Sequence, residues 1–312
     1  MTLSDHTASL SEARQRKMAI EKCTIEMASK FAENATSTVY GSIGIVDAYL
    51  TSYLWRIAKN NGDLAVVVID SIYSKIVPVT DLVEIISSLE CVSHAEVFEK
   101  QNLANAIPIP EMELSNLSRK HFVANTPHRT QVSLDGPNKC VCIEELLSLY
   151  GGMPGSREFP LIAVSGCFDV FHMGHNQLIS TARKTAPNGR LLVITLSDSS
   201  ITKQSKNLAG DRPIYPQDCR VHMLSSLRAV DHVLVLDSLD CISALEILGI
   251  DLFVKSIRDI DRPIVIEEAC VINRRGGQTI YTEQVEKGKS TTRFLEKIRA
   301  YIQGISPKSV DV

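Results

Sequence analysis

The sequence has few aromatic residues, no marked excess of either charge and no long hydrophobic run. Phe, Trp and Tyr make up 5% of its 312 residues, and 33 Lys and Arg nearly balance 36 Asp and Glu. A net charge of −3, without a long run of Lys or Arg, gives no indication of nucleic-acid binding. No stretch is apolar and long enough to span a membrane, and the first residues lack the apolar centre of a signal peptide. We therefore expect a cytoplasmic protein without a membrane span.

The eight cysteines do not form a disulfide or zinc pattern. A chain of this length can fold without disulfides, and the pair Cys140 and Cys142 has no second pair at the spacing of zinc ligands. We expect these two cysteines to alternate along a short strand. Apolar residues at 44% and charged residues at 22% are typical of globular proteins, and the length favours two domains over one.

A motif with two histidines lies just past the middle of the chain. The short apolar run 161–165 predicts a buried strand, and a loop from Gly166 leads to a helix that starts near Asn176. Glycine lets the backbone approach a ligand closely. His172 and His175 are three residues apart, so they project from one face of the first helical turn. Two imidazoles and several free backbone N–H groups then point at one place, which predicts an anion site.

The residues G-C-F-D-V-F-H-M-G-H at 166–175 resemble the signature of the HxGH nucleotidyltransferase superfamily, which includes cytidylyltransferases and ADP-heptose synthase. A chance match at six fixed positions has a frequency below about 10⁻⁷ per starting position. The resemblance implies a Rossmann-like domain that transfers a nucleotidyl group from a nucleoside triphosphate and releases pyrophosphate, with Mg²⁺ as cofactor. It implies that His172 and His175 are catalytic and that Asp169 contacts Mg²⁺. The implied nucleotide-binding loop consists of Gly166, Cys167, Phe168, Asp169 and Gly174.

Later segments extend the resemblance over nearly all of residues 159–303. Arg220 matches a helix arginine that approaches the nucleotide phosphates in the family, where it acts with a loop lysine. Both Lys203 and Lys206 lie in the corresponding polar loop, 199–207, and the choice between them stays open. Lys255 ends a strand that resembles the family's D-x-x-V-K strand. The segment 286–295 resembles the closing G-x-S-T-T block, which implies nucleotide contacts from Ser290, Thr291 and Thr292.

The departures from the family pattern favour its heptose branch. Val285 stands where choline- and glycerol-phosphate cytidylyltransferases usually have an arginine that the heptose enzymes also lack. The segment 275–280 resembles the heptose enzymes' Gly-Gly turn before a strand. However, residues 256–258 (SIR) stand where those enzymes have glycines, which leaves the sugar or base contacts there open.

The first half of the chain resembles the second half in sequence but lacks the two motif histidines. A gapless offset of 125 places Gly41 on Gly166, Asp47 on His172 and Leu50 on His175. Further along, ISSLECVSHAEV at 86–97 matches LSSLRAVDHVLV at 224–235 in six of twelve positions. Because an aspartate would repel a phosphate where a histidine would attract it, the first copy is not expected to catalyse.

We therefore predict an α/β protein of two tandem Rossmann-like domains with parallel sheets, the first degenerate. The predicted parts are an N-terminal helix at 1–34, the degenerate domain at 35–115, a linker region at 116–158 and the catalytic domain at 159–312. The alternation of apolar runs and helical patterns after residue 159 supports the parallel sheet. We expect the first domain to pack on the second and to shield its phosphate site, and we favour a homodimer.

The predicted function is transfer of a nucleoside monophosphate from ATP or CTP to a phosphorylated sugar. The first alternative is a cytidylyltransferase for phosphoethanolamine, phosphocholine or glycerol 3-phosphate. The tandem layout favours it, because ethanolamine-phosphate cytidylyltransferase also has two such domains, although its first domain keeps the HxGH motif. The second alternative is a nucleotide-binding regulator with weak or lost turnover.

Overall fold

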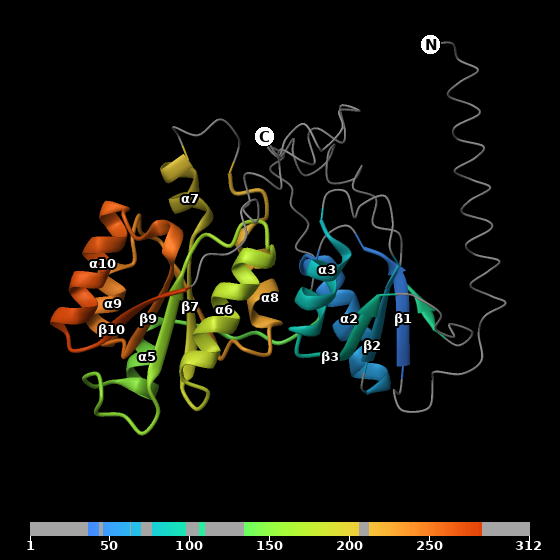
Figure 1. The fold of residues 1–312 in the computed structure, drawn as a ribbon, viewed down its shortest axis with the longest axis horizontal. Helices are drawn as coiled ribbons and strands as arrows, with labels where there is room; N and C mark the ends of the chain where they lie inside the picture. The colour runs from blue at the N-terminus through green and yellow to red at the C-terminus, as the bar shows by residue number, and fades with distance from the viewer. Residues whose placement is uncertain are drawn as a thin grey trace, which may run out of the picture.

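The computed structural model describes residues 37–43, 46–62, 64–69, 77–97, 106–109, 134–205 and 212–282. The predicted N-terminal helix at 1–34 and residues 116–133 of the predicted linker region lie outside these residues. The described chain forms two parallel sheets, one in each half (Figure 1). The predicted α/β class with parallel sheets is confirmed, while the exact domain boundaries stay a prediction. None of the described helices is both long and apolar enough to cross a membrane.

The first sheet has four strands in the order β3-β2-β1-β4. They are β1 (Ser37–Ser42), β2 (Leu64–Ile69), β3 (Val92–Val97) and the short β4 (Ile107–Pro108), and all neighbours are parallel. Helix α2 (Ala48–Asn61) connects β1 to β2, and α3 (Val79–Ser87) lies between β2 and β3. We call residues 37–109 the first unit.

The second sheet has six parallel strands in the order β10-β9-β6-β7-β8-β5. Its strands are β5 (Cys140–Val141), β6 (Leu161–Ser165), β7 (Arg190–Leu196), β8 (His232–Leu236), β9 (Leu252–Ser256) and β10 (Gln278–Thr282). Its helices are α5 (Ile143–Tyr150), α6 (Met173–Thr185), α7 (Asp198–Ser205), α8 (Gln217–Ser225), α9 (Ile242–Leu248) and α10 (Pro263–Arg274). We call residues 134–282 the second unit.

Two sequence expectations are wrong in detail. The segment predicted as a polar loop at 199–207 contains α7, which begins at Asp198 and ends at Ser205. Cys142 does not continue the short strand of Cys140. Instead it is the N-cap of α5, where its sulfur accepts a hydrogen bond from the Glu145 N–H. Cysteine is not among the residues that usually cap helices, so the sequence alone favoured a strand position for Cys142.

Alternate side chains along β6 pack on opposite faces of the second sheet, as the two-residue period of a strand requires. Ile162 and Val164 of β6 pack into the hydrophobic cluster that includes α6 and α8, whereas Leu161 and Ala163 pack into the opposite cluster with α5, α9 and α10. The sheet is therefore covered on both faces, as a parallel sheet requires.

The two units have matching architecture. The order β3-β2-β1-β4 corresponds to β8-β7-β6-β9, so the first unit has the strand order of the centre of the second. Shifted by the sequence offset of 125, the bounds of α2 become 173–186, and α6 covers 173–185. The repeat inferred from the sequence therefore appears as a repeat of elements in the same order.

The units contact each other through equivalent surfaces. An antiparallel bridge joins Leu89 to Leu227, the Glu90 N–H donates to the Ser226 carbonyl over 2.9 Å, and the Arg228 N–H donates to the Ser88 carbonyl over 3.0 Å. In the sequence alignment these residues are equivalent in pairs. Likewise α2 contacts α8 while α3 contacts α6. The contact is thus an approximate two-fold interface within one chain, like that of a symmetric dimer.

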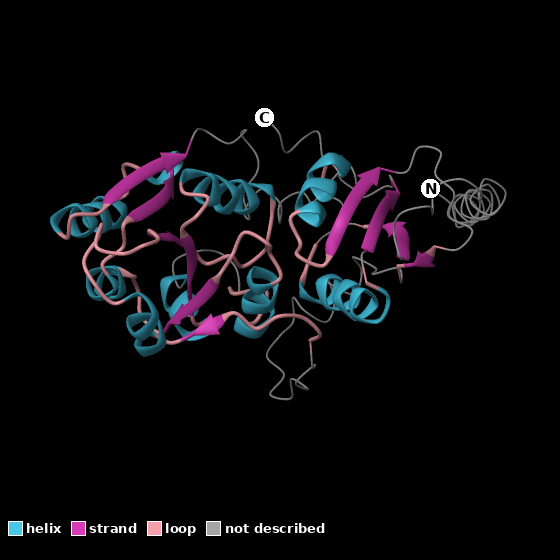
Figure 2. Ribbon diagram, turned by 90° about the horizontal axis from the view of Figure 1, so that it is seen from below, coloured by secondary structure: helices cyan, strands magenta, loops and turns pink. Residues whose placement is uncertain are grey.

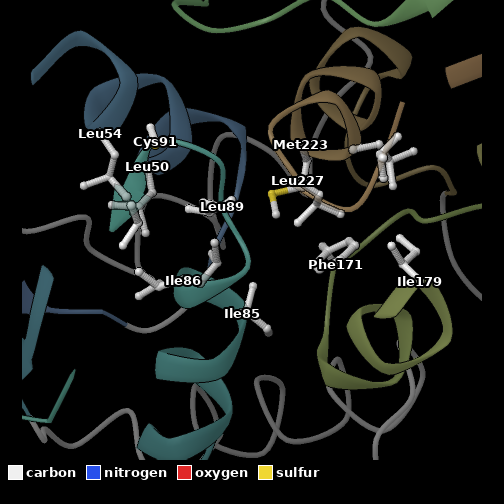
Figure 3. Packing of buried hydrophobic residues seen from close by; sticks show 14 of the residues in the cluster. Leu50, Leu54, Ile85, Ile86, Leu89, Cys91, Phe171, Ile179, Met223 and Leu227 are labelled. Atoms are coloured by element: carbon white, nitrogen blue, oxygen red, sulfur yellow. The ribbon is translucent and has the colours of Figure 1, made fainter. Parts of the chain in front are cut away.

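Side chains reinforce this interface. In Figures 1 and 2 the two sheets stand on either side of a layer formed by α2, α3, α6 and α8. Figure 3 shows Leu89 and Ile85 of the first unit facing Leu227 and Phe171 of the second, and all four are buried in one continuous cluster. The Arg228 guanidinium also donates to the carbonyls of Leu89 and Val92, over 3.1 and 2.7 Å.

Because one hydrophobic cluster spans both units, we predict that they unfold together. Trp55, the chain's single tryptophan, lies on α2 of the first unit beside Gly136 of the second, so it reports on the first unit and on its contact with the second. In urea, its fluorescence should change with the same midpoint as far-UV circular dichroism. Leu227→Ala should lower both midpoints equally, at a cost of about 2–4 kcal/mol. The exposed Leu149 provides a control, since Leu149→Ala should cost less than about 0.5 kcal/mol. A tryptophan transition at lower urea than the dichroism transition would contradict a shared core.

Candidate active site

A cavity of about 460 Å³ opens at the carboxyl ends of the second unit's strands. Ser165 ends β6, Lys255 and Ser256 end β9, and Thr282 ends β10, and all of them line it. This is the edge at which open parallel sheets bind ligands. The structure gathers most of the predicted site residues around this cavity: Gly166, Cys167, Phe168, Asp169, His172, Gly174, His175 and Lys255.

The loop after β6 makes a sharp turn before α6 begins. Phe168 has φ of 48°, the only positive φ of a non-glycine residue in the described chain. Such a conformation costs about 1–2 kcal/mol and tends to be kept where the surrounding structure fixes a functional loop. A Cβ on Gly166 would lie 3.2 Å from the Phe168 ring, so the glycine also gives this turn room to close.

The two motif histidines lie together at the start of α6. Their rings stack with centroids 3.9 Å apart and an interplanar angle of 21°. His172 is the N-cap of α6, and its Nδ1 accepts a hydrogen bond from the Gly174 N–H over 3.1 Å. A neutral imidazole that accepts at Nδ1 carries its proton on Nε2. His172 can therefore donate from Nε2 to an anion in the cavity that both rings line.

Burial and neighbouring cations keep both imidazoles neutral. Burial, together with the charges of Arg258 and Arg212, lowers the pKa of His172 to about 4. Burial also lowers the pKa of His175, as do His172 and Arg212. A polyanion in the cavity would reverse these effects, because its charge favours the protonated form. The pair is therefore suited to donate hydrogen bonds to phosphate and to gain positive character as negative charge arrives.

Asp169 has a structural partner for each oxygen. Its Oδ1 accepts from the backbone N–H groups of Ile214 and Tyr215, over 2.7 and 2.9 Å, and its Oδ2 accepts from Arg212 Nε over 2.9 Å. The residue is 1% exposed. These contacts argue against the expected Mg²⁺ contact, because the carboxylate already neutralises Arg212 and fixes the loop before α8.

Arg220 does not face the cavity, contrary to its expected role at the phosphates. Its guanidinium is fully buried and makes five hydrogen bonds within the protein. The acceptors are the carbonyls of Cys167, Leu196 and Tyr215, the hydroxyl of Thr195 and the carboxylate of Asp198. Since a guanidinium has five N–H donors, none is left for a phosphate in this conformation. Arg220 holds together the loops that follow β6 and β7.

The remaining predicted cations are placed differently. Lys255 is 8% exposed and lines the cavity, and its Nζ is 2.8 Å from Glu268 Oε2 and 3.0 Å from Ser165 Oγ. Lys203 is exposed on α7 and does not line the cavity. Lys206, Ser290, Thr291 and Thr292 lie outside the described residues, so their expected roles stay predictions.

Three arginines at the cavity were not predicted to bind ligand. Arg212 lies between α7 and α8, Arg258 lies in the 3₁₀ turn Ile257–Asp259, and Arg262 precedes α10. The signal for Arg258 was in the sequence, because it stands where the heptose enzymes have glycine. Carboxylates of the same lining pair with two of these arginines, Asp169 with Arg212 and Asp259 with Arg262, so the arginines offer N–H donors to an anion and little net positive charge.

The expected shielding of this site by the first unit is not seen. Within the ranges that the structure describes, only residues of the second unit line the cavity. The first unit packs behind the motif loop instead, where α2 approaches Phe171 and Tyr215.

The depressed His172 pKa predicts that acid destabilises the protein. The unfolded chain protonates this imidazole near pH 6.5, whereas the folded protein does so near pH 4, so stability falls as the pH falls through this window. Between pH 7 and 4, wild type should lose about 2 kcal/mol more unfolding free energy than His172→Asn, which keeps a helix-capping side chain. Urea unfolding at each pH measures this. The exposed His94 gives the control His94→Asn, which should follow wild type. Parallel curves for His172→Asn and wild type would contradict the burial effect.

The buried bonds of Arg220 predict a stability role. Arg220→Met should lower the unfolding free energy by about 3 kcal/mol or more, because it leaves several buried acceptors without a donor. Arg274→Met, at an exposed ion pair with Glu246, should cost less than about 0.5 kcal/mol. A stable Arg220→Met protein whose only defect is weaker nucleotide binding would restore the phosphate role.

The sequence comparisons match the part of the chain that forms this site. Residues 163–297 match the family model described as Cytidylyltransferase-like. The chain is 29% identical over 199 residues to the bifunctional protein HldE of Citrifermentans bemidjiense, which covers 63% of this chain and 38% of that protein. It is 33% identical over 137 residues to HldE of Gluconacetobacter diazotrophicus, covering 44% of this chain and 26% of that protein. The chain thus spans less than half the length of these relatives.

Among solved structures, a lipopolysaccharide core biosynthesis protein from Thermoplasma volcanium is similar at 19% identity and a TM-score of 0.33. The match covers 41% of this chain and 98% of that one. This likeness is too weak to bear on the function. The motif and the family match together show that residues 163–297 are a cytidylyltransferase-like domain of the HxGH nucleotidyltransferase superfamily.

Proposed function

We propose that the chain transfers a nucleotidyl group from a nucleoside triphosphate to a phosphorylated sugar and releases pyrophosphate. The observation that carries this proposal is the stacked pair of neutral imidazoles at the start of α6, in a cavity lined by three arginines. The similarity to HldE and the family's known chemistry support a sugar phosphate as the acceptor class.

In the proposed reaction, a phosphate oxygen of the acceptor attacks the α-phosphorus of the triphosphate. The new P–O bond forms as the bond to the bridging oxygen breaks, and pyrophosphate leaves with the bonding electrons. Chemistry of this kind requires accurate positioning and stabilisation of charge more than covalent catalysis.

The residues at the cavity can supply both requirements. His172 Nε2 donates to a phosphate oxygen near the N-terminus of α6, where the helix dipole also favours negative charge. The His175 ring stacks on the His172 ring, so the negative charge of the same phosphate also favours the protonated form of His175. Arg212, Arg258 and Arg262 lie at the same cavity and can donate hydrogen bonds to the departing pyrophosphate or the acceptor phosphate.

Magnesium is not given a protein site by the described residues. They contain no group of three or more His, Cys, Asp or Glu side chains that could hold a metal ion, and the oxygens of Asp169 have other partners. A Mg²⁺ ion that arrives on a triphosphate uses phosphate oxygens and water as its main ligands. The roles proposed above depend only on side chains of this chain.

The alternative acceptor class is a phosphoalcohol, with CTP as donor. The observation that favours it is the pair of sheets with matching strand order, since the tandem layout resembles ethanolamine-phosphate cytidylyltransferase. The homodimer and the cytoplasmic location stay predictions.

Pyrophosphate release separates these possibilities. Purified protein is incubated with ATP or CTP and with heptose 1-phosphate, glycerol 3-phosphate or phosphoethanolamine. Turnover with a sugar phosphate supports the proposal, and turnover with CTP and a phosphoalcohol supports the alternative. Nucleotide binding without pyrophosphate release from any pair would instead indicate a regulator.

In the active combination, His172→Ala and His175→Ala should each lower kcat by about 100-fold or more, because each removes a donor at the developing charge. The exposed His94 is on the first unit, so His94→Ala should leave kcat unchanged. Circular dichroism checks that the variants fold. Near-normal turnover in either motif variant would remove that histidine from the mechanism.

A further inference from the structure

We infer that Asp47 of the first unit is a positioning residue for the active site, acting through Tyr215 on the loop that holds Asp169. The first copy has lost its motif histidines, but the side chain in the first histidine's place contacts the second unit. This inference rests on the proposed function for its activity test, while the contacts that carry it are independent of that function.

Asp47 and His172 occupy the same position in the two copies. The sequence offset of 125 aligns them, and they are the N-caps of the helices that follow the equivalent strands β1 and β6. His172 Nδ1 accepts from a backbone N–H two residues on, at Gly174. Asp47 Oδ1 accepts from Tyr49 N–H, also two residues on, and from Leu50 N–H, both over 3.0 Å. The replacement therefore preserves the cap of the helix.

The second carboxylate oxygen of Asp47 reaches across the interface. Its Oδ2 accepts a hydrogen bond from the Tyr215 hydroxyl over 3.2 Å. Asp47 is 6% exposed and Tyr215 is 5% exposed, so water competes little for this bond. Burial raises the pKa of the Tyr215 hydroxyl, and the Asp47 carboxylate raises it further. The hydroxyl therefore keeps its proton and remains a donor.

Tyr215 is also a direct partner of the motif aspartate. Its backbone N–H donates to Asp169 Oδ1 over 2.9 Å, beside the Ile214 N–H at 2.7 Å. Its carbonyl accepts from Arg220 Nε over 3.2 Å, and Arg220 in turn donates to the carbonyl of Cys167 in the motif loop. Tyr215 thus connects Asp47 of the first unit to two residues of the loop that presents the histidines, directly to Asp169 and through Arg220 to Cys167.

The exchange of histidine for aspartate suits this role. A neutral imidazole that capped the helix through Nδ1 would offer only a donor at Nε2. A carboxylate has two acceptor oxygens, so one can cap the helix while the other receives the tyrosine hydroxyl. The second unit has an imidazole that lines the cavity at this position, whereas the first unit has a carboxylate that binds Tyr215 of the second unit.

Tyr215→Phe tests the inference, because it removes only the hydroxyl. We expect kcat to fall about tenfold with the KM for nucleotide changed less than threefold, since a displaced loop affects alignment more than binding. Backbone amide exchange at Ile214 and Tyr215 should become faster. Asp47→Ser keeps a helix cap but cannot reach Tyr215, so it should give the same changes. The double variant should be no worse than either single variant.

Tyr150→Phe is the matched control. It removes a part-buried hydroxyl that is 2.7 Å from His232 Nε2, in the second unit but away from the cavity. This variant should keep kcat and the exchange rates at Ile214 and Tyr215. The inference is overturned if Tyr215→Phe and Asp47→Ser keep kcat within twofold and leave amide exchange unchanged. It is also overturned if Tyr150→Phe lowers kcat equally.

The two proposals can fail separately. If wild type turns over none of the substrate pairs, the proposed function fails, and amide exchange at Ile214 and Tyr215 still decides the inference. Faster exchange in Tyr215→Phe and Asp47→Ser, but not in Tyr150→Phe, then supports the Asp47 connection. Unchanged exchange in all three variants overturns it.

Discussion

The site depends on a buried carboxylate whose two oxygens both accept hydrogen bonds from other groups of the protein. Asp169 is 1% exposed, and it accepts from Arg212 and from two backbone N–H groups in the loop before α8. An unpaired charge at this depth would cost several kcal/mol, so the motif loop and this loop must form together. The turn at Phe168 and the start of α6 at His172 follow from the resulting loop position. Asp169 is therefore an organising residue that places the histidines at the strand ends.

The duplicated architecture gives this arrangement a second support. Equivalent segments of the two units form an approximate two-fold interface around Leu89 and Leu227, with backbone bonds that correspond in both directions. A symmetric dimer would use the same surface twice, whereas here one side of it has diverged. The first unit has no histidine pair, but its side chains complete a shared core and contact the second unit's loop at Tyr215. Loss of chemistry in one copy is thus compatible with retention of its packing surface.

Sequence reasoning predicted the residues whose roles depend on spacing. The apolar run 161–165, the glycine after it and two histidines three residues apart specified a strand end, a turn and a helix start, and the structure has all three. It was less successful where a role depends on which way a side chain points. Arg220 matches the family pattern in position but turns inward, because five acceptors from separate loops meet there. Asp169 pairs with Arg212, 43 residues away, and no local pattern encodes such a pair. The placement of the first unit behind the loop likewise depends on tertiary packing.

The central claim is that the paired imidazoles bind the triphosphate of a nucleotide. The most direct measurement is a crystal structure of the whole chain with a non-hydrolysable analogue of ATP or CTP, whichever binds more tightly in calorimetry. The account predicts phosphate oxygens within hydrogen-bond distance of His172 Nε2 and beside the His175 ring, in the cavity at the ends of β6 and β9. A triphosphate bound elsewhere on the chain, with both rings out of its reach, would contradict the account.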